Sequence, residues 1–125
     1  MPCKITVQKD IHPNVAYIGL GGHIGIEEAV DVSKSLEEVL GDGYNWIILS
    51  LKEVEFICTA GIGAMLYAVG GARRAGGDII FIDFSSDIQA LFKFLDLNDY
   101  VTTATGTIGA IRLIQKWPGY ESGSE

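Results

Sequence analysis

The sequence predicts an α/β domain with a mixed sheet of four to five strands and about four helices. Two short strand-like segments come first, and two nearly continuous apolar segments, 46–51 and 78–84, follow later in the chain. Continuous apolar runs of this length are typical of parallel strands that are covered on both faces. Segments with helical spacing separate the apolar runs, which is the arrangement of βαβ units packed on one sheet.

The chain is expected to begin with an antiparallel hairpin. Residues 4–8 alternate polar and apolar side chains, and residues 15–20 form a second strand-like run. The His-Pro-Asn sequence at 12–14 is a turn signal between them. The glycine-rich segment 21–25 is expected to be a loop, and 101–103 a short edge strand.

Four segments have the apolar spacing of helices: 27–40, 60–75, a segment capped by Ser86, and 107–116. Gln89 follows Ser86 at capping-box distance. The side chains expected to face the core are Ala29, Val32, Leu36 and Val39 in the first helix, Ile62, Met65, Leu66 and Val69 in the second, Ile88, Leu91, Phe92 and Leu95 in the third, and Ile108, Ile111 and Ile114 in the fourth.

Composition indicates one domain in a reducing compartment. The chain has 125 residues, of which 48% are hydrophobic, so residues 1–117 are expected to form the domain and 118–125 a flexible tail. The net charge of −7 and the absence of a Lys/Arg cluster argue against nucleic-acid binding. Two cysteines, no signal-peptide pattern and no run of ~20 apolar residues predict a cytoplasmic protein without membrane contact.

Three loops are expected to meet at one edge of the sheet. They are 22–25, 56–61 and the Ser85-Ser86 segment, which follow the second, third and fourth predicted strands. The carboxyl ends of parallel strands lie at the same edge, and ligands usually bind there. The functional residues are therefore sought in these loops.

The segments at this edge resemble the motifs of the STAS domain family, the bacterial anti-sigma factor antagonists. The stretch Phe56-Ile-Cys-Thr-Ala-Gly-Ile-Gly63 stands where the family has an Asp-Ser-Ser-Gly-Leu-Gly-like motif that opens a helix. The stretch 21–24 resembles the family's turn before the first helix, 76–83 its glycine-glycine-strand step, and 92–97 its leucine-phenylalanine run. The resemblance covers residues 4–116 and implies a STAS-like (SpoIIAA-like) fold.

The resemblance also implies a function. Members of the family are regulatory binding modules of signal transduction that are not enzymes and use no cofactor or metal. They bind an anti-sigma-factor serine/threonine kinase in a partner-switching pathway that regulates transcription. The kinase phosphorylates the first hydroxyl residue of the motif, which corresponds to Thr59 and is expected at or near a helix N-cap, where backbone N–H groups favour an anion. A monomer or weak homodimer is expected. The implied partner-binding residues are Gly22, His23, Gly25, Cys58, Thr59, Ala60, Gly61, Gly63 and Ala64.

Three positions depart from the family pattern. Cys58 replaces the Asp before the phosphoacceptor, Gly25 replaces an Asp in the first-helix loop, and Ser50 replaces an acidic or amide residue. A second hypothesis is therefore a phosphorylation-independent STAS scaffold or small-ligand sensor in a larger signalling assembly. A third is an enzyme or redox sensor in which Cys58 is the nucleophile and His23 its base. The simpler interpretation of Cys58 is a small buried apolar residue between Ile57 and Thr59.

Overall fold

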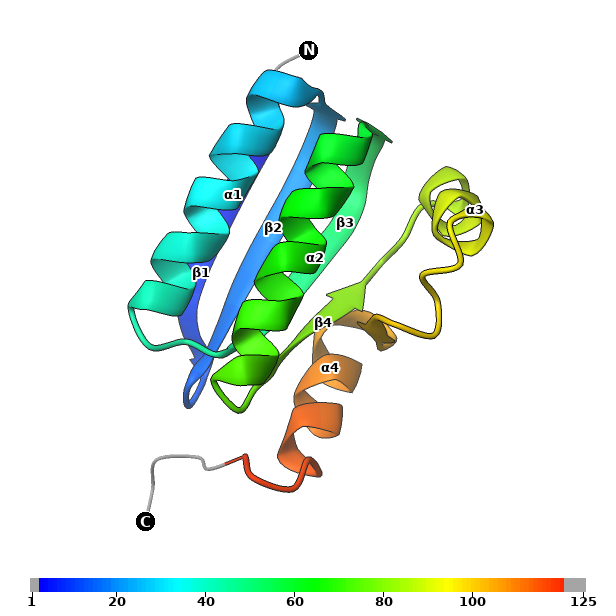
Figure 1. The fold of residues 1–125 in the computed structure, drawn as a ribbon. Coiled ribbons are helices and arrows are strands. Elements are labelled where there is room, and N and C mark those ends of the chain that lie inside the picture. The colour runs from blue at the N-terminus through cyan, green and yellow to red at the C-terminus, as the bar shows by residue number, and fades with distance from the viewer. Residues whose placement is uncertain (1–2, 121–125) are drawn as a thin grey trace.

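A computed structural model of the chain describes residues 3–120 (Figure 1). Within these residues it has one five-stranded sheet in the order β1-β2-β3-β4-β5 and four helices. β1 and β2 are antiparallel, and the other neighbouring strands are parallel. The predicted α/β class and mixed sheet are confirmed. The elements are β1 Lys4–His12, β2 Val15–Ile24, α1 Ile26–Gly41, β3 Trp46–Ile57, α2 Thr59–Arg74, β4 Asp78–Ile82, α3 Ser86–Phe94, β5 Thr102–Thr103 and α4 Gly106–Gln115.

The helices cover both faces of the sheet (Figure 1). α1 and α2 lie side by side on one face, α3 lies beyond the end of β4, and α4 packs on the opposite face. The larger core lies between the sheet and α1, α2 and α3, and it contains the fully buried Leu49 and Phe81. A smaller core joins α4 to Trp46, Ile48 and Ile80. Among the described helices none is long and apolar enough to cross a bilayer.

β3 is longer than predicted, because it continues past Leu51 to Ile57. Gly19 pairs with Ser50 whereas Gly21 pairs with Glu53, so β3 carries one extra residue at this point. The register shifts in the same way between Gly22 and His23. Such β-bulges bend a strand and redirect its side chains. Here the buried side chains after the first bulge are Leu51, Val54 and Ile57, at intervals of three residues instead of two.

The segment 21–24, predicted to be a loop, is the end of strand β2. Gly21 pairs with Lys4 on one side and with Glu53 on the other, and the parallel pairing continues to Ile24 opposite Ile57. The sequence pattern did not predict this part of the strand, because glycines have no side chain that could alternate between apolar and polar. Gly22, with φ of 82°, allows the local irregularity.

Two helix predictions need correction. The N-cap of α3 is Ser85, whose Oγ accepts a hydrogen bond from the backbone N–H of Ile88 at 3.2 Å, whereas Ser86 is the first helical residue. Ser85 also accounts for the capping, so the predicted Ser86–Gln89 box is wrong. In α4 the side chain of Ile108 is 68% exposed, because the helix packs through Ala110 and Ile114. The predicted inward positions are otherwise buried or partly buried, except Leu95, which is 37% exposed.

The last described residues pack against the domain. Tyr120, which falls in the predicted tail, donates a hydrogen bond from its hydroxyl to the carbonyl oxygen of Pro13 at 2.7 Å. Its ring stands edge-on to Trp46, with 5.9 Å between ring centroids. Residues 121–125 of the predicted tail lie outside the described residues.

Candidate functional site

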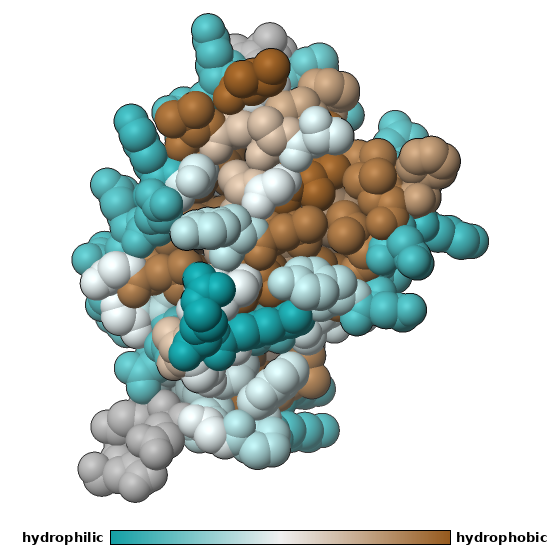
Figure 2. All heavy atoms as spheres, viewed as in Figure 1, coloured by the Kyte–Doolittle hydropathy of each residue, from teal (hydrophilic) through white to brown (hydrophobic). Residues whose placement is uncertain are grey.

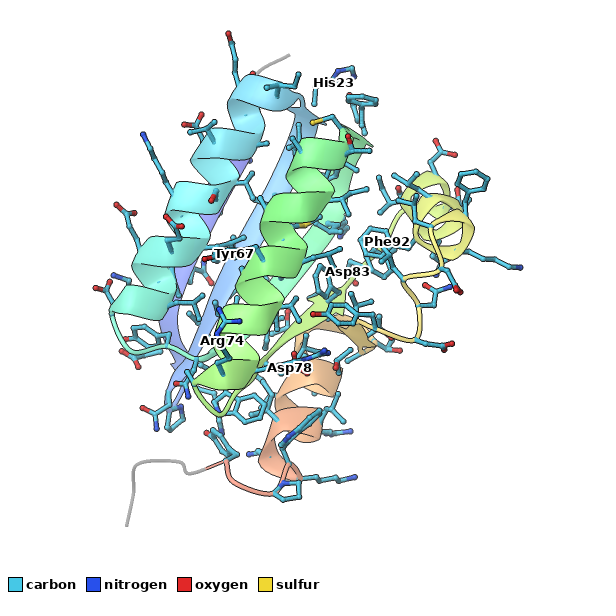
Figure 3. The ribbon with its side chains drawn as sticks, in the orientation of Figure 1. His23, Tyr67, Arg74, Asp78, Asp83 and Phe92 are labelled. Atoms are coloured by element: carbon cyan, nitrogen blue, oxygen red, sulfur yellow. The ribbon has the colours of Figure 1, made fainter. Side chains whose placement is uncertain are left out.

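The carboxyl ends of β2 and β3 lie beside the first turns of α1 and α2. Ile24 pairs with Ile57 at the end of the two strands, and the backbone N–H of Cys58 donates to the carbonyl oxygen of Ile24 at 2.9 Å. The two loops predicted to meet are therefore joined by a hydrogen bond. Figure 3 shows His23 at this end of the molecule, near the start of α2.

The first turn of α1 brings a carboxylate to this end. Gly25 is the N-cap, and its backbone N–H donates to Oε1 of Glu28 at 3.1 Å. A Cβ on residue 25 would lie 3.0 Å from the same oxygen, so glycine leaves room for the contact. Glu28 therefore holds a negative charge beside the position where the family pattern has an Asp.

The first turn of α2 presents Thr59 to solvent. Cys58, half-buried and with extended backbone, is the N-cap, and its side chain makes no capping hydrogen bond. Thr59 is the first helical residue, and both Thr59 and Ala60 are exposed. The first turn contains no acidic residue. The exposed hydroxyl thus stands at the positive end of the helix dipole, where the first N–H groups have no partner within the helix.

Two glycines of the motif have different surroundings. Gly61 is buried, and a Cβ there would lie 2.8 Å from Cγ1 of Ile57 and 3.0 Å from Cγ2 of Ile24. This glycine lets α2 approach the strand ends closely. Gly63 is exposed and would have no neighbour within 4 Å of a Cβ. Of the other predicted site residues, His23 is exposed, and Gly22 and Ala64 are half-buried.

Exposed apolar side chains, which the sequence analysis did not single out, lie at the end of β3 and at the start of α1. Phe56 is 47% exposed and packs on His23, with 5.3 Å between ring centroids. Ile26 is 75% exposed in the first turn of α1, and Val30 is 52% exposed one turn later. Figure 2 shows apolar surface at the end of the molecule where α1 begins. We call the surface formed by His23, Ile26, Phe56, Thr59 and Gly63 the α1–α2 edge.

The surroundings of Cys58 do not favour the hypothesis that it is a nucleophile with His23 as its base. The ring of His23 packs against Phe56, and within residues 3–120 it makes no hydrogen bond to Cys58. The same residues contain no cluster of three His, Cys, Asp or Glu side chains that could hold a metal ion. The α1–α2 edge is instead an exposed, partly apolar surface around one hydroxyl group.

Comparison with known proteins agrees with this fold. The family model of the STAS domain matches residues 6–109. A search of curated proteins gives no significant match. An anti-sigma factor antagonist from Mycobacterium paratuberculosis is 14% identical, with a TM-score of 0.80 over 91% of this chain and 95% of that chain.

Two structures of the anti-sigma factor antagonist SpoIIAA are also similar. Its unphosphorylated form is 16% identical, with a TM-score of 0.72 over 91% of this chain and 100% of that chain. The phosphorylated form, from Bacillus, is 17% identical, with a TM-score of 0.70 over 88% of this chain and 99% of that chain. These likenesses show a shared fold, and the family match spans most of the sequence. The chain belongs to the STAS domain family.

Proposed function

We propose that the chain is a regulatory module of the anti-sigma factor antagonist type. It docks through the α1–α2 edge onto an anti-sigma-factor serine/threonine kinase in a bacterial cytoplasm, in a pathway that regulates transcription. The observation that carries the proposal is the exposed Thr59 hydroxyl within a partly apolar surface that includes Ile26 and Phe56. When a partner protein covers exposed apolar side chains of this kind, their surface is removed from water, which stabilises the complex.

Thr59 is proposed as the phosphoacceptor that controls docking. A phosphate on its hydroxyl would add roughly −1.5 to −2 charges at neutral pH. The partial positive charge at the start of α2 would stabilise that anion by about 0.3–1 kcal/mol. In the complex the same charge would have to lose its water among apolar side chains such as Phe56, which opposes association. Phosphorylation is therefore expected to release the partner. The structurally similar SpoIIAA has been solved in phosphorylated and unphosphorylated forms.

A phosphorylation-independent STAS scaffold or small-ligand sensor is the second candidate. It is favoured by the neutral residues Gly25 and Cys58 at positions where the family pattern has carboxylates. In that case the α1–α2 edge would still bind a protein, and Thr59 would contribute only packing and hydrogen bonds at the interface.

The phosphoacceptor proposal is tested by intact mass after incubation with ATP and anti-sigma-factor kinases from the source genome. The wild type is compared with Thr59→Ala and with Thr105→Ala, which changes an exposed threonine at the N-cap of α4. One added phosphate on the wild type and on Thr105→Ala, and none on Thr59→Ala, is the expected result. A phosphate that persists in Thr59→Ala would refute the assignment. No phosphate from kinases that modify their own antagonists would favour the scaffold.

A further inference from the structure

The face of the sheet that carries α4 is only partly covered. α4 packs over Val15, Ile48 and Ile80, toward the beginnings of the parallel strands. Toward their carboxyl ends the same face forms a cavity of about 340 Å³. Polar or small residues dominate its lining: Lys4, Thr6, Gln8, Tyr17, Gly19, Leu20, Gly21, Ser50, Lys52, Glu53 and Asp83.

The first bulge of β3 shapes this cavity. Because the strand has an extra residue between Ser50 and Glu53, both Lys52 and Glu53 point away from the large core. Gly19 and Gly21 form part of the cavity wall, where the absence of a side chain leaves room for the neighbouring residues. A Cβ on Gly19 would lie 3.1 Å from the hydroxyl oxygen of Tyr17, so the phenol ring lies over that glycine.

A buried hydroxyl group lies at the floor of the cavity. The side chain of Ser50 is only 4% exposed, and its Oγ accepts a hydrogen bond from the backbone N–H of Lys52 at 3.3 Å. A serine hydroxyl that accepts one hydrogen bond still has a proton to donate. Ser50 therefore offers a donor to an acceptor group held in the cavity.

The charged side chains that line the cavity balance in number and come from different strands of the sheet. Lys4 belongs to the outer strand β1 and pairs with Gly21. Asp83 directly follows Ile82, the β4 residue that pairs with Ser50. Figure 3 shows Asp83 just past the end of β4. Two lysines and two carboxylates thus line one small cavity: Lys4 from β1, Lys52 and Glu53 from β3, and Asp83 directly after β4.

We propose that this cavity binds a small zwitterion of the amino acid class. Its carboxylate would face Lys52 and the hydroxyl of Ser50, and its ammonium group would face Asp83. The charge pattern favours a molecule that carries both groups, and the volume lies at the small end of the range for ligand sites, roughly 300–1,000 Å³. The position, at the carboxyl ends of parallel strands, is where α/β sheets bind ligands.

The proposal is independent of kinase docking, and its test uses no kinase. The protein amino acids and 4-aminobutyrate are titrated one at a time into ¹⁵N-labelled protein, and the backbone amide signals of Gly19, Gly21 and Lys52 are followed by NMR. Ethanolamine and acetate serve as probes with only one of the two charges. The variants are Ser50→Ala and Lys52→Gln, and Lys34→Gln, an exposed lysine of α1, is the matched control.

The expected result is a saturable shift of the Gly19 and Gly21 signals with at least one zwitterion and a weaker response to either single-charge probe. The affinity is expected to fall about tenfold in Ser50→Ala and in Lys52→Gln, because each loses a hydrogen bond to a charged group. In Lys34→Gln it is expected to be unchanged. Three results would overturn the proposal: no shift with any zwitterion, equal binding of acetate or ethanolamine, or equal affinity in all variants.

Discussion

Replacing Asp78 with alanine should destabilise the fold strongly, because its buried carboxylate accepts three hydrogen bonds. Asp78 begins β4 (Figure 3). Its side chain is 1% exposed. Its carboxylate accepts hydrogen bonds from the backbone N–H of Ile79 at 2.8 Å, from Nε of Arg73 at 3.0 Å and from Oγ1 of Thr102 at 2.7 Å. The Arg73 guanidinium also donates to the carbonyl oxygen of Tyr100 at 2.7 Å. Asp78 therefore ties β4 to α2 and to β5.

The expected loss in Asp78→Ala is about 3 kcal/mol. A hydrogen bond to a charged group contributes about 1.5–3 kcal/mol, and a buried donor that loses its partner costs about 1–3 kcal/mol. The N–H of Ile79 is buried, so without the carboxylate it has no hydrogen-bond partner and the full cost applies. The side chain of Arg73 is 35% exposed and can hydrogen-bond to water instead. Asp78→Asn keeps one acceptor oxygen and is expected to lose roughly half as much. A loss of ~3 kcal/mol lowers Tm by about 10 °C in a domain of this size.

Urea unfolding followed by circular dichroism measures this loss directly, provided that the m-value stays unchanged. Asp99→Ala, at an exposed aspartate in the segment before β5, is the control and is expected to stay within about 0.5 kcal/mol of the wild type. A loss below about 1 kcal/mol in Asp78→Ala would mean that water replaces all three hydrogen bonds, and that Asp78 does not hold β4 to α2 and β5.

Three further predictions concern packing and titration. Gly77→Ala should remove most of the stability or abolish folding, because its Cβ would lie 1.8 Å from the carbonyl oxygen of Asn45; a folded variant with wild-type Tm would contradict this. Burial raises the pKa of the Tyr120 hydroxyl, so its contribution to the free energy of unfolding is present below the unfolded pKa of about 10 and is lost as pH rises through the folded pKa. Tyr120→Phe should therefore lose less stability between about pH 9 and pH 11 than the wild type. Equal losses in the two proteins would contradict this prediction. Burial, and to a smaller extent the carboxylates of Asp31 and Glu28, raises the pKa of the Cys3 thiol. In a Cys58→Ala background, iodoacetamide should therefore modify Cys3 more slowly than free cysteine, measured by intact mass. An equal rate would contradict the raised pKa.

The parallel centre of the sheet could be predicted because its residues are buried on both sides. Ile47 and Leu49 enter the larger core, while Trp46 and Ile48 enter the smaller one, and this produces the continuous apolar run. The second half of β3 could not be predicted in this way. Its two bulges place buried side chains at intervals of three residues, so the pattern matches neither a regular strand nor a helix.

The sequence predicted which end of the sheet carries the candidate site, but only some of the residues exposed there. The order of strands and loops was enough to bring the segments around His23 and Thr59 together. The exposure of Ile26 and Phe56 depends on how α1 and the bulged end of β3 are oriented, which no local pattern encodes. The N-cap of α2 falls on Cys58, one residue before the expected hydroxyl, because β3 and α2 are joined by this single residue.

Docking of a kinase on the α1–α2 edge can be measured by calorimetric titration with purified anti-sigma-factor kinases from the source genome. Gly63→Gln places a neutral side chain into open space on the α1–α2 edge, and Gly41→Gln places the same side chain into open space at the last residue of α1. We expect one such kinase to bind the wild type and Gly41→Gln with equal affinity and Gly63→Gln about tenfold or more weakly. Equal affinity for all three proteins, or no binding to any of the kinases, would contradict this expectation.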